Sequence, residues 1–251
     1  WDEFNIMNTT ATEPHMLPGS YARSALKRGL AQEAELGINP FKFGMIGSTD
    51  DHTSLATAAE DNFFGKFPNS EPGIRTPHSK MAGALNADWS LSASGLAAVW
   101  ATENTRAAIF DAIERREVYA TTGSRITLRL FAGWGFPDNA VVQPDFARIG
   151  YTQGVAMGGD LTAKPADVQA PTFMVAAQRD PDGANLDQIQ IVKGWLAEDG
   201  STQERIYYVA LSDNRSVDEQ TGKPPAVAST IDAETATYTN TVGAASLAAQ
   251  W

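Results

Sequence analysis

The chain has 251 residues, of which 19 are basic and 30 are acidic, so its formal net charge is -11. This charge repels nucleic acid and anionic membranes, and the sequence contains no segment apolar enough to span a bilayer. The absence of cysteine excludes disulfides and thiolate metal sites. An apolar content of 43% is typical of a globular protein, and the length allows one large domain or two ordinary ones.

The first predicted element is a helix that begins after Ser20, an N-cap residue, and ends at Gly37. Its apolar residues recur at helical spacing at Ala22, Ala25, Leu26, Leu30 and Ala34. Pro40 then precedes the alternating apolar residues of 41–47, which predict a buried strand. A helix followed by a strand is the repeating unit of α/β folds.

Residues of the kinds that bind metals follow this predicted strand directly, in the sequence Ser48-Thr49-Asp50-Asp51-His52. On an extended backbone, residues two apart point the same way, so Asp50 and His52 could converge on one ion while Asp51 faces elsewhere. A carboxylate and an imidazole suit zinc, manganese or iron better than calcium. Because two ligands do not complete a metal site, a solvated turn is the alternative.

A long segment rich in Ala, Asn, Ser, Pro and Gly spans residues 53–94 and is predicted to be a lid or a substrate loop. Its densest mixture of polar and aromatic residues supplies three candidate loop contacts, which are Asp61, Asn62 and Lys66. A docked loop anchored by its aromatic residues is the alternative. His15 and His78 are the only other histidines, neither follows a predicted strand, and His78 is expected at the surface.

A second helix is predicted from about Thr102 to Glu117, followed by a strand at 118–120. Beyond Ser124 the pattern changes to period-two strands separated by Gly, Pro and Asp turns, which indicates an antiparallel β-rich, sandwich-like domain. The predicted strands cover 126–130, 172–177, 189–195 and 205–211. These patterns divide the chain into domains 1–124 and 125–251. The polar residues of 212–250 predict only loops and an edge strand.

The loop between two of these strands carries alternating oxygen donors at Asp180, Asp182, Asn185 and Asp187. These side chains could wrap a calcium ion, although the loop lacks the spacing and the final Glu of an EF-hand. A plain Asp/Gly turn is the favoured interpretation.

Residues 1–124 contain too few elements for a closed barrel. A parallel (β/α) barrel takes about eight strand–helix units and about 250 residues, whereas this region has only a pair of clear units. The metal site is likewise short of ligands. Both deficits predict that the chain is the C-terminal part of a longer protein and lacks an N-terminal portion.

Several segments resemble, in order, the second half of a large bacterial family labelled as a domain of unknown function. They are MLPGSYARSALKRGL, FGMIGSTDDHTS, EDNFFGK, ENTRAAIFDAIERREVYATTGSRI and DPDGANLDQIQIVKGW. That family looks like a branch of the PHP (polymerase and histidinol phosphatase) metal-dependent hydrolases. The resemblance implies an α/β fold, in which the C-terminal portion of a distorted PHP-like (β/α) barrel precedes the β-rich domain. It also implies several divalent metals, an N-terminal His-x-His that this sequence lacks, and a periplasmic or secreted location.

These expectations combine into a metal-dependent hydrolase of a small-molecule phosphoester, phosphonate or carboxylic ester. Asp50 and His52 are the expected metal ligands, and Asp51 could be an extra electrostatic group or could orient one of the ligands. Arg23 or Arg125 could steady an anionic group of the substrate.

The alternative function is a non-catalytic binding or interaction module that uses the β-rich domain. An exposed Trp134 or Trp195 would favour this interpretation.

Overall fold

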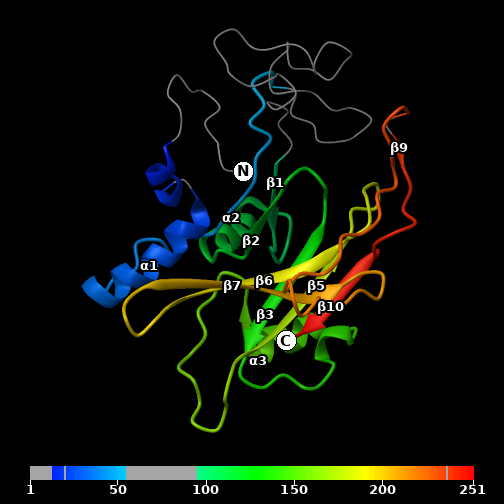
Figure 1. Cartoon of the computed structure of the whole chain (residues 1–251). Coiled ribbons are helices and arrows are strands. Elements are labelled where there is room, and N and C mark those ends of the chain that lie inside the picture. Colours follow the sequence, from blue (N-terminus) through cyan, green and yellow to red (C-terminus); the bar gives the residue numbers. More distant parts are fainter. Residues whose placement is uncertain (1–12, 20, 55–94, 236) are drawn as a thin grey trace. The chain divides into compact units, whose positions relative to one another are not determined.

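The computed structural model describes residues 13–19, 21–54, 95–235 and 237–251 (Figure 1). The chain forms two compact units. Unit 1 consists of residues 1–97, 120–123 and 194–204, and unit 2 consists of residues 98–119, 124–193 and 205–251. The chain therefore passes between the units repeatedly, and the domain boundary placed near Ser124 stays a prediction.

The helix predicted near the N-terminus is confirmed as α1, Ala22–Leu36, and a 3-10 helix, η1, precedes it at Pro14–Gly19. Gly37 ends α1 with a left-handed φ of 73°, and its amide donates to a carbonyl of the last turn. Glycine adopts this conformation without the steric cost that a Cβ imposes. The N-cap is Tyr21, which makes no side-chain cap, and Ser20 lies outside the described residues.

The strand predicted at 41–47 is wrong, because this segment forms no regular element. One backbone hydrogen bond, from the Gly47 amide to the Leu96 carbonyl at 3.2 Å, holds it beside the chain that follows. A Cβ on Gly47 would lie 2.7 Å from that carbonyl oxygen, so the two backbones approach closely. The hydroxyls of Ser48 and Thr49 accept hydrogen bonds from amides two residues ahead. Such local bonds compete with a strand ladder.

The α/β barrel expected for residues 1–124 is also wrong. β1, Leu96–Val99, and β2, Val118–Thr121, form a two-stranded sheet, and α2, Arg106–Glu114, connects them. In a barrel such a helix returns the chain to a parallel strand. Here the Trp100 amide, just after β1, donates to the Glu117 carbonyl, just before β2, at 3.0 Å. The end of one strand therefore meets the start of the next, and α2 closes an antiparallel pair.

The period-two strands predicted in the second half are confirmed, and so is their antiparallel pairing in the central sheet. Their bounds are β3, Thr127–Gly133; β5, Thr172–Gln178; β6, Gln188–Leu196; and β7, Thr202–Leu211. The segment 212–250 contributes β8, Ile231–Asp232; β9, Thr237–Tyr238; and the edge strand β10, Ser246–Gln250. The sequence pattern did not predict η5, Ala140–Val142; α3, Phe146–Gln153; or β4, Gly154–Ala156.

The core of unit 2 is a four-stranded sheet with the strand order β10-β5-β3-β4, in which every pair is antiparallel. Directly opposed residues share a face, so the register defines rows of side chains across β3, β5 and β10. On one face these rows are Phe131–Met174–Gln250, Arg129–Ala176–Ala248 and Thr127–Gln178–Ser246.

Both faces of this sheet are packed against other elements. Phe131 and Met174 form a buried cluster with residues of η5 and α3. Gly150 of α3 allows this close packing, because a Cβ there would lie 2.3 Å from Cγ of the Phe131 ring. On the opposite face, Val175 belongs to a second cluster that includes Ile189 of β6, with Val209 and Ala210 of β7 packed against it. The sheet therefore lies between a helical layer and a β-hairpin.

Candidate functional site

The side chains of Asp50 and His52 lie together, with 3.3 Å between Asp50 Oδ1 and His52 Nε2. The pair does not arise from an extended strand, because Asp50 has a left-handed φ of 50°. Aspartate adopts this conformation more readily than most residues that carry a Cβ. Both side chains are about half exposed. A carboxylate oxygen and an imidazole nitrogen thus face one small volume, as two ligands of a single ion would.

The Asp51 carboxylate is engaged in the same local turn. It accepts hydrogen bonds from both the amide and the hydroxyl of Thr53. The hydroxyls of Ser48 and Thr49 accept from the amides of Asp50 and Asp51, at 3.1 Å and 3.4 Å. Consecutive bonds of this kind hold the backbone around the pair in one conformation. The auxiliary role of Asp51 stays a prediction.

The Asp50–His52 pair fits only part of a metal centre. A catalytic zinc usually has about three protein ligands and a water. Within residues 13–19, 21–54, 95–235 and 237–251, no group of at least three His, Cys, Asp or Glu side chains could hold an ion. Among the described residues, the pair therefore has no third His, Cys, Asp or Glu ligand beside it.

Several predicted site residues fall in that undescribed part. Asp61, Asn62 and Lys66, the candidate loop contacts, lie outside the described residues, and so does His78. His15 is described and is exposed in η1.

The two arginines expected to steady an anionic substrate have different surroundings. Arg23 Nη1 lies 3.1 Å from Glu204 Oε1, and Lys27 Nζ lies 3.2 Å from the other oxygen of that carboxylate. Burial raises the pKa of Glu204, but the Lys27 hydrogen bond and both cationic charges outweigh this and lower it. Arg125 is exposed, and its backbone amide donates to Asp180 Oδ2 at 2.6 Å. A substrate role for either arginine stays a prediction.

The predicted calcium loop forms a hydrogen-bonded turn. Asp180 is 7% exposed, and its carboxylate accepts hydrogen bonds from the amides of Arg125 and Asp182, at 2.6 Å and 3.0 Å. These bonds lower the pKa of Asp180. The Arg179 guanidinium donates to three carbonyls of the loop, with 3.2 Å, 3.0 Å and 2.7 Å between nitrogen and oxygen. An arginine thus occupies oxygens that a calcium ion would need.

The far end of this loop is also bonded to protein groups. Asp187 pairs with Arg215, and the Asn185 side-chain amide donates to the carbonyls of Asn240 and Val242. These contacts support the turn interpretation. Calcium binding stays a prediction, and an ion there would have to displace existing donors.

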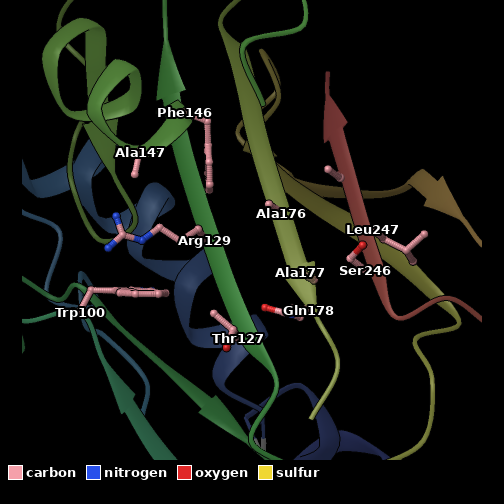
Figure 2. A pocket seen from close by; sticks show the side chains of 11 residues that line it. Trp100, Thr127, Arg129, Phe146, Ala147, Ala176, Ala177, Gln178, Ser246 and Leu247 are labelled. Carbon is pink, nitrogen blue, oxygen red and sulfur yellow. The ribbon is translucent and has the colours of Figure 1, made fainter. Parts of the chain in front are cut away.

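A pocket of about 550 Å³ lies on the helix-packed face of the central sheet, within unit 2. Its floor is formed by the rows Arg129–Ala176–Ala248 and Thr127–Gln178–Ser246, and Trp100, Phe146 and Ala147 also line it (Figure 2). The hollow has a simple cause. The neighbouring row presents a phenylalanine and a methionine to α3, whereas the Arg129 row presents two alanines, whose methyl groups leave the space unfilled.

Arg129 is the charged group of this pocket, and it reaches from β3 towards Trp100 (Figure 2). Its guanidinium carbon lies 3.7 Å from the ring centroid of Trp100, and Nη1 donates to the Tyr151 hydroxyl at 3.2 Å. That hydroxyl in turn donates to Glu117, which is 5% exposed and pairs with Arg115. Burial and the hydrogen bond to Glu117 raise the pKa of Tyr151 above its usual value, so the phenol stays neutral.

Sequence reasoning missed this pocket. The alternation in β3 could have indicated the pocket, because it places Thr127, Arg129 and Phe131 on one face. The charged Arg129 then lies between two uncharged side chains of that face. The aromatic partners Trp100 and Tyr151 come from segments that no local pattern connects to β3. Their contribution depends on long-range packing.

The tryptophans named as markers of a binding surface are not fully exposed. Trp134 and Trp195 are both half-buried. The Trp134 indole N–H donates to the Thr162 carbonyl at 3.3 Å. Neither side chain therefore provides the exposed aromatic surface that would favour the binding module.

The whole chain, residues 1–251, matches the model of a family described as a protein of unknown function, DUF3604, and the chain belongs to that family. No curated protein and no solved structure matches the chain. The resemblance to a family of unknown function is thus confirmed, whereas none of these comparisons relates the chain to the PHP hydrolases. Among the described helices, none has both the length and the apolar character needed to cross a membrane.

Proposed function

We propose that this DUF3604 chain takes part in metal-dependent hydrolysis of a phosphoester or a related ester, with Asp50 and His52 as two of the metal ligands. The observation that carries the proposal is the 3.3 Å distance between Asp50 Oδ1 and His52 Nε2. The hydrogen-bonded turn around these residues supports it, because a ligand pair with a fixed backbone loses less conformational freedom when an ion binds.

A divalent metal bound there would supply a Lewis acid and would lower the pKa of a bound water towards about 7. The chain's own contribution is to hold two donors at one point and to keep them accessible to solvent.

The test is to express the complete reading frame and to measure bound zinc, manganese and iron. Turnover of phosphodiester, phosphonate and carboxylic ester substrates is then measured for the wild type, Asp50→Ala and His52→Ala. Both variants should lose metal and activity together. Glu35→Gln, which changes an exposed carboxylate of α1, is the matched control and should change neither. Unaltered metal content and turnover in both ligand variants would refute the proposal.

A second function, ligand binding by the β-rich unit 2, is favoured by the pocket above the central sheet. Its volume of about 550 Å³ lies within the usual range for small-molecule sites, which is roughly 300 to 1,000 Å³. Binding that survives Asp50→Ala would separate this function from hydrolysis. A pocket that takes up none of a panel of small apolar probes would count against it.

A further inference from the structure

We propose that the unit 2 pocket binds a small organic carboxylate, whose anionic group pairs with Arg129 and whose apolar body lies on the alanine floor. The proposal rests on the binding function proposed for unit 2 and specifies its ligand. It does not depend on metal binding at Asp50 and His52.

The Arg129 guanidinium has hydrogen-bond donors to spare. A guanidinium has five N–H donors, and the hydrogen bond to the Tyr151 hydroxyl at 3.2 Å employs one of them. In the described part of the chain, no carboxylate lies within ion-pair distance of Arg129. A half-buried cation with several N–H groups left to bond is suited to an anionic ligand.

Neighbouring side chains hold the Arg129 guanidinium in one orientation. The guanidinium lies 3.7 Å from the Trp100 ring centroid, and its carbon is 5.3 Å from the Tyr151 ring centroid. Stacking and the hydrogen bond hold the planar group in place, so less freedom is lost when a ligand binds. A fixed planar fork favours a planar carboxylate, which can accept two parallel hydrogen bonds.

The network of Arg129, Tyr151, Glu117 and Arg115 carries a net positive charge. Glu117 is the nearest acidic group in the network, but it already pairs with Arg115, whose Nη2 lies 3.3 Å from the carboxylate. Two arginines and one glutamate leave one positive charge beside the pocket. The Tyr151 hydroxyl stays neutral and adds no opposing charge. Because the whole chain carries a net charge of -11, this site is a local exception that would attract an anion.

The rest of the pocket combines apolar surface with polar groups at one edge. Ala176, Ala248, Phe146 and Leu247 supply apolar surface, and they favour an apolar body over a bare inorganic ion. A single arginine also matches a monoanion better than a phosphate, which usually has several donors or a helix N-terminus. The row Thr127–Gln178–Ser246 offers polar groups at one edge, where a ligand hydroxyl could bond.

The test uses the 251-residue chain and two probes of the same shape, 3-phenylpropionate and its neutral amide. Calorimetry and NMR titration should show that the carboxylate binds at least about tenfold more tightly, because only the carboxylate can accept charge-assisted hydrogen bonds from Arg129. Arg129→Gln should remove that preference, and Arg129→Lys should keep part of it. Ala176→Leu should weaken both probes, because it fills the floor.

Arg148→Gln is the matched control. It changes an exposed arginine of α3 that pairs with Asp145 and does not line the pocket, so binding should be unaltered. Circular dichroism and urea midpoints establish that each variant is folded. If Arg129→Gln fails to fold, Ala176→Leu still tests the site independently.

The two levels of the proposal fail differently. The carboxylate inference would be overturned if the amide and the carboxylate bound equally and Arg129→Gln did not change their affinity. If Ala176→Leu still weakened both probes, ligand binding by unit 2 would remain supported. Binding of neither probe, together with no response to a panel of small apolar compounds, would overturn both. Phenyl phosphate serves as a further comparison, and tighter binding of it than of the carboxylate would also overturn the inference.

Discussion

The substitution Asp180→Asn tests whether the loop between β5 and β6 is held by a buried carboxylate. In the wild type, the two carboxylate oxygens accept hydrogen bonds from the amides of Arg125 and Asp182, at 2.6 Å and 3.0 Å. An asparagine has nearly the same shape but only one acceptor oxygen. Its NH₂ group would therefore face one of the two amides, so that one backbone donor is left unsatisfied at a site that is 7% exposed.

The expected loss follows from these contacts. A hydrogen bond to a charged acceptor contributes about 1.5 kcal/mol, and a neutral one about 1 kcal/mol. Losing one charged bond and weakening the other should lower the free energy of unfolding by about 2 kcal/mol. For a chain of this size, that change corresponds to a decrease in Tm of roughly 4 to 8 °C.

The assay is urea and thermal unfolding followed by circular dichroism at several pH values. Because folding lowers the pKa of Asp180, its stabilising contribution is present above the unfolded pKa of about 3.9 and is lost as the pH falls through the lower folded pKa. The difference in the free energy of unfolding between wild type and Asp180→Asn should therefore be largest near neutral pH and should decrease below about pH 4. Asp182→Asn, an exposed change in the same loop, is the control. If the stability difference is as large in acid as at neutral pH, this reasoning is contradicted. An equal decrease in the free energy of unfolding in Asp182→Asn would contradict it as well.

Two further predictions concern the helical layer over the central sheet. Gly150→Ala should lower the free energy of unfolding by about 1 to 3 kcal/mol, despite a helix-propensity gain of about 1 kcal/mol, because its Cβ would lie 2.3 Å from the buried Phe131 ring. Gly135→Ala, where a Cβ meets nothing within 4 Å, is the control for urea unfolding, and equal stability of the two variants would contradict the packing argument. Glu117→Gln should lower the pKa of Tyr151 towards its usual 10.0, because it removes a negative charge that raises it. Ultraviolet titration of phenolate absorbance measures the pKa of Tyr151, and Tyr151→Phe identifies its signal. An unchanged pKa in Glu117→Gln would show that the Glu117 carboxylate does not raise it.

Local sequence patterns predicted several elements well. The spacing of apolar residues and the final Gly37 define α1, and the alternation at 172–177 defines β5, Thr172–Gln178. These patterns work because the cause is local: helix and strand periods act on neighbouring side chains. The second helix was predicted too long, from about Thr102, because Thr105 caps α2 by accepting from the Ala108 amide.

The overall architecture could not be obtained in the same way. A strand, a helix and a further strand indicated a parallel α/β unit, but the Trp100 amide bonds to the Glu117 carbonyl and makes the pair antiparallel. The periodicity of apolar residues predicts that a strand exists, but it does not predict which strand pairs with it. The pairing is a long-range contact and is decided by packing.

The sequence by itself determined that Asp50 and His52 are two residues apart, and a local turn, in place of the predicted strand, keeps their side chains together at 3.3 Å. Only the tertiary structure decided the surroundings of Arg129. The pocket exists because the antiparallel register aligns Ala176 and Ala248 with this arginine, and because folding brings Trp100 to its guanidinium. Alignment across strands depends on hydrogen-bond register and on the packing of distant segments, which no local pattern encodes.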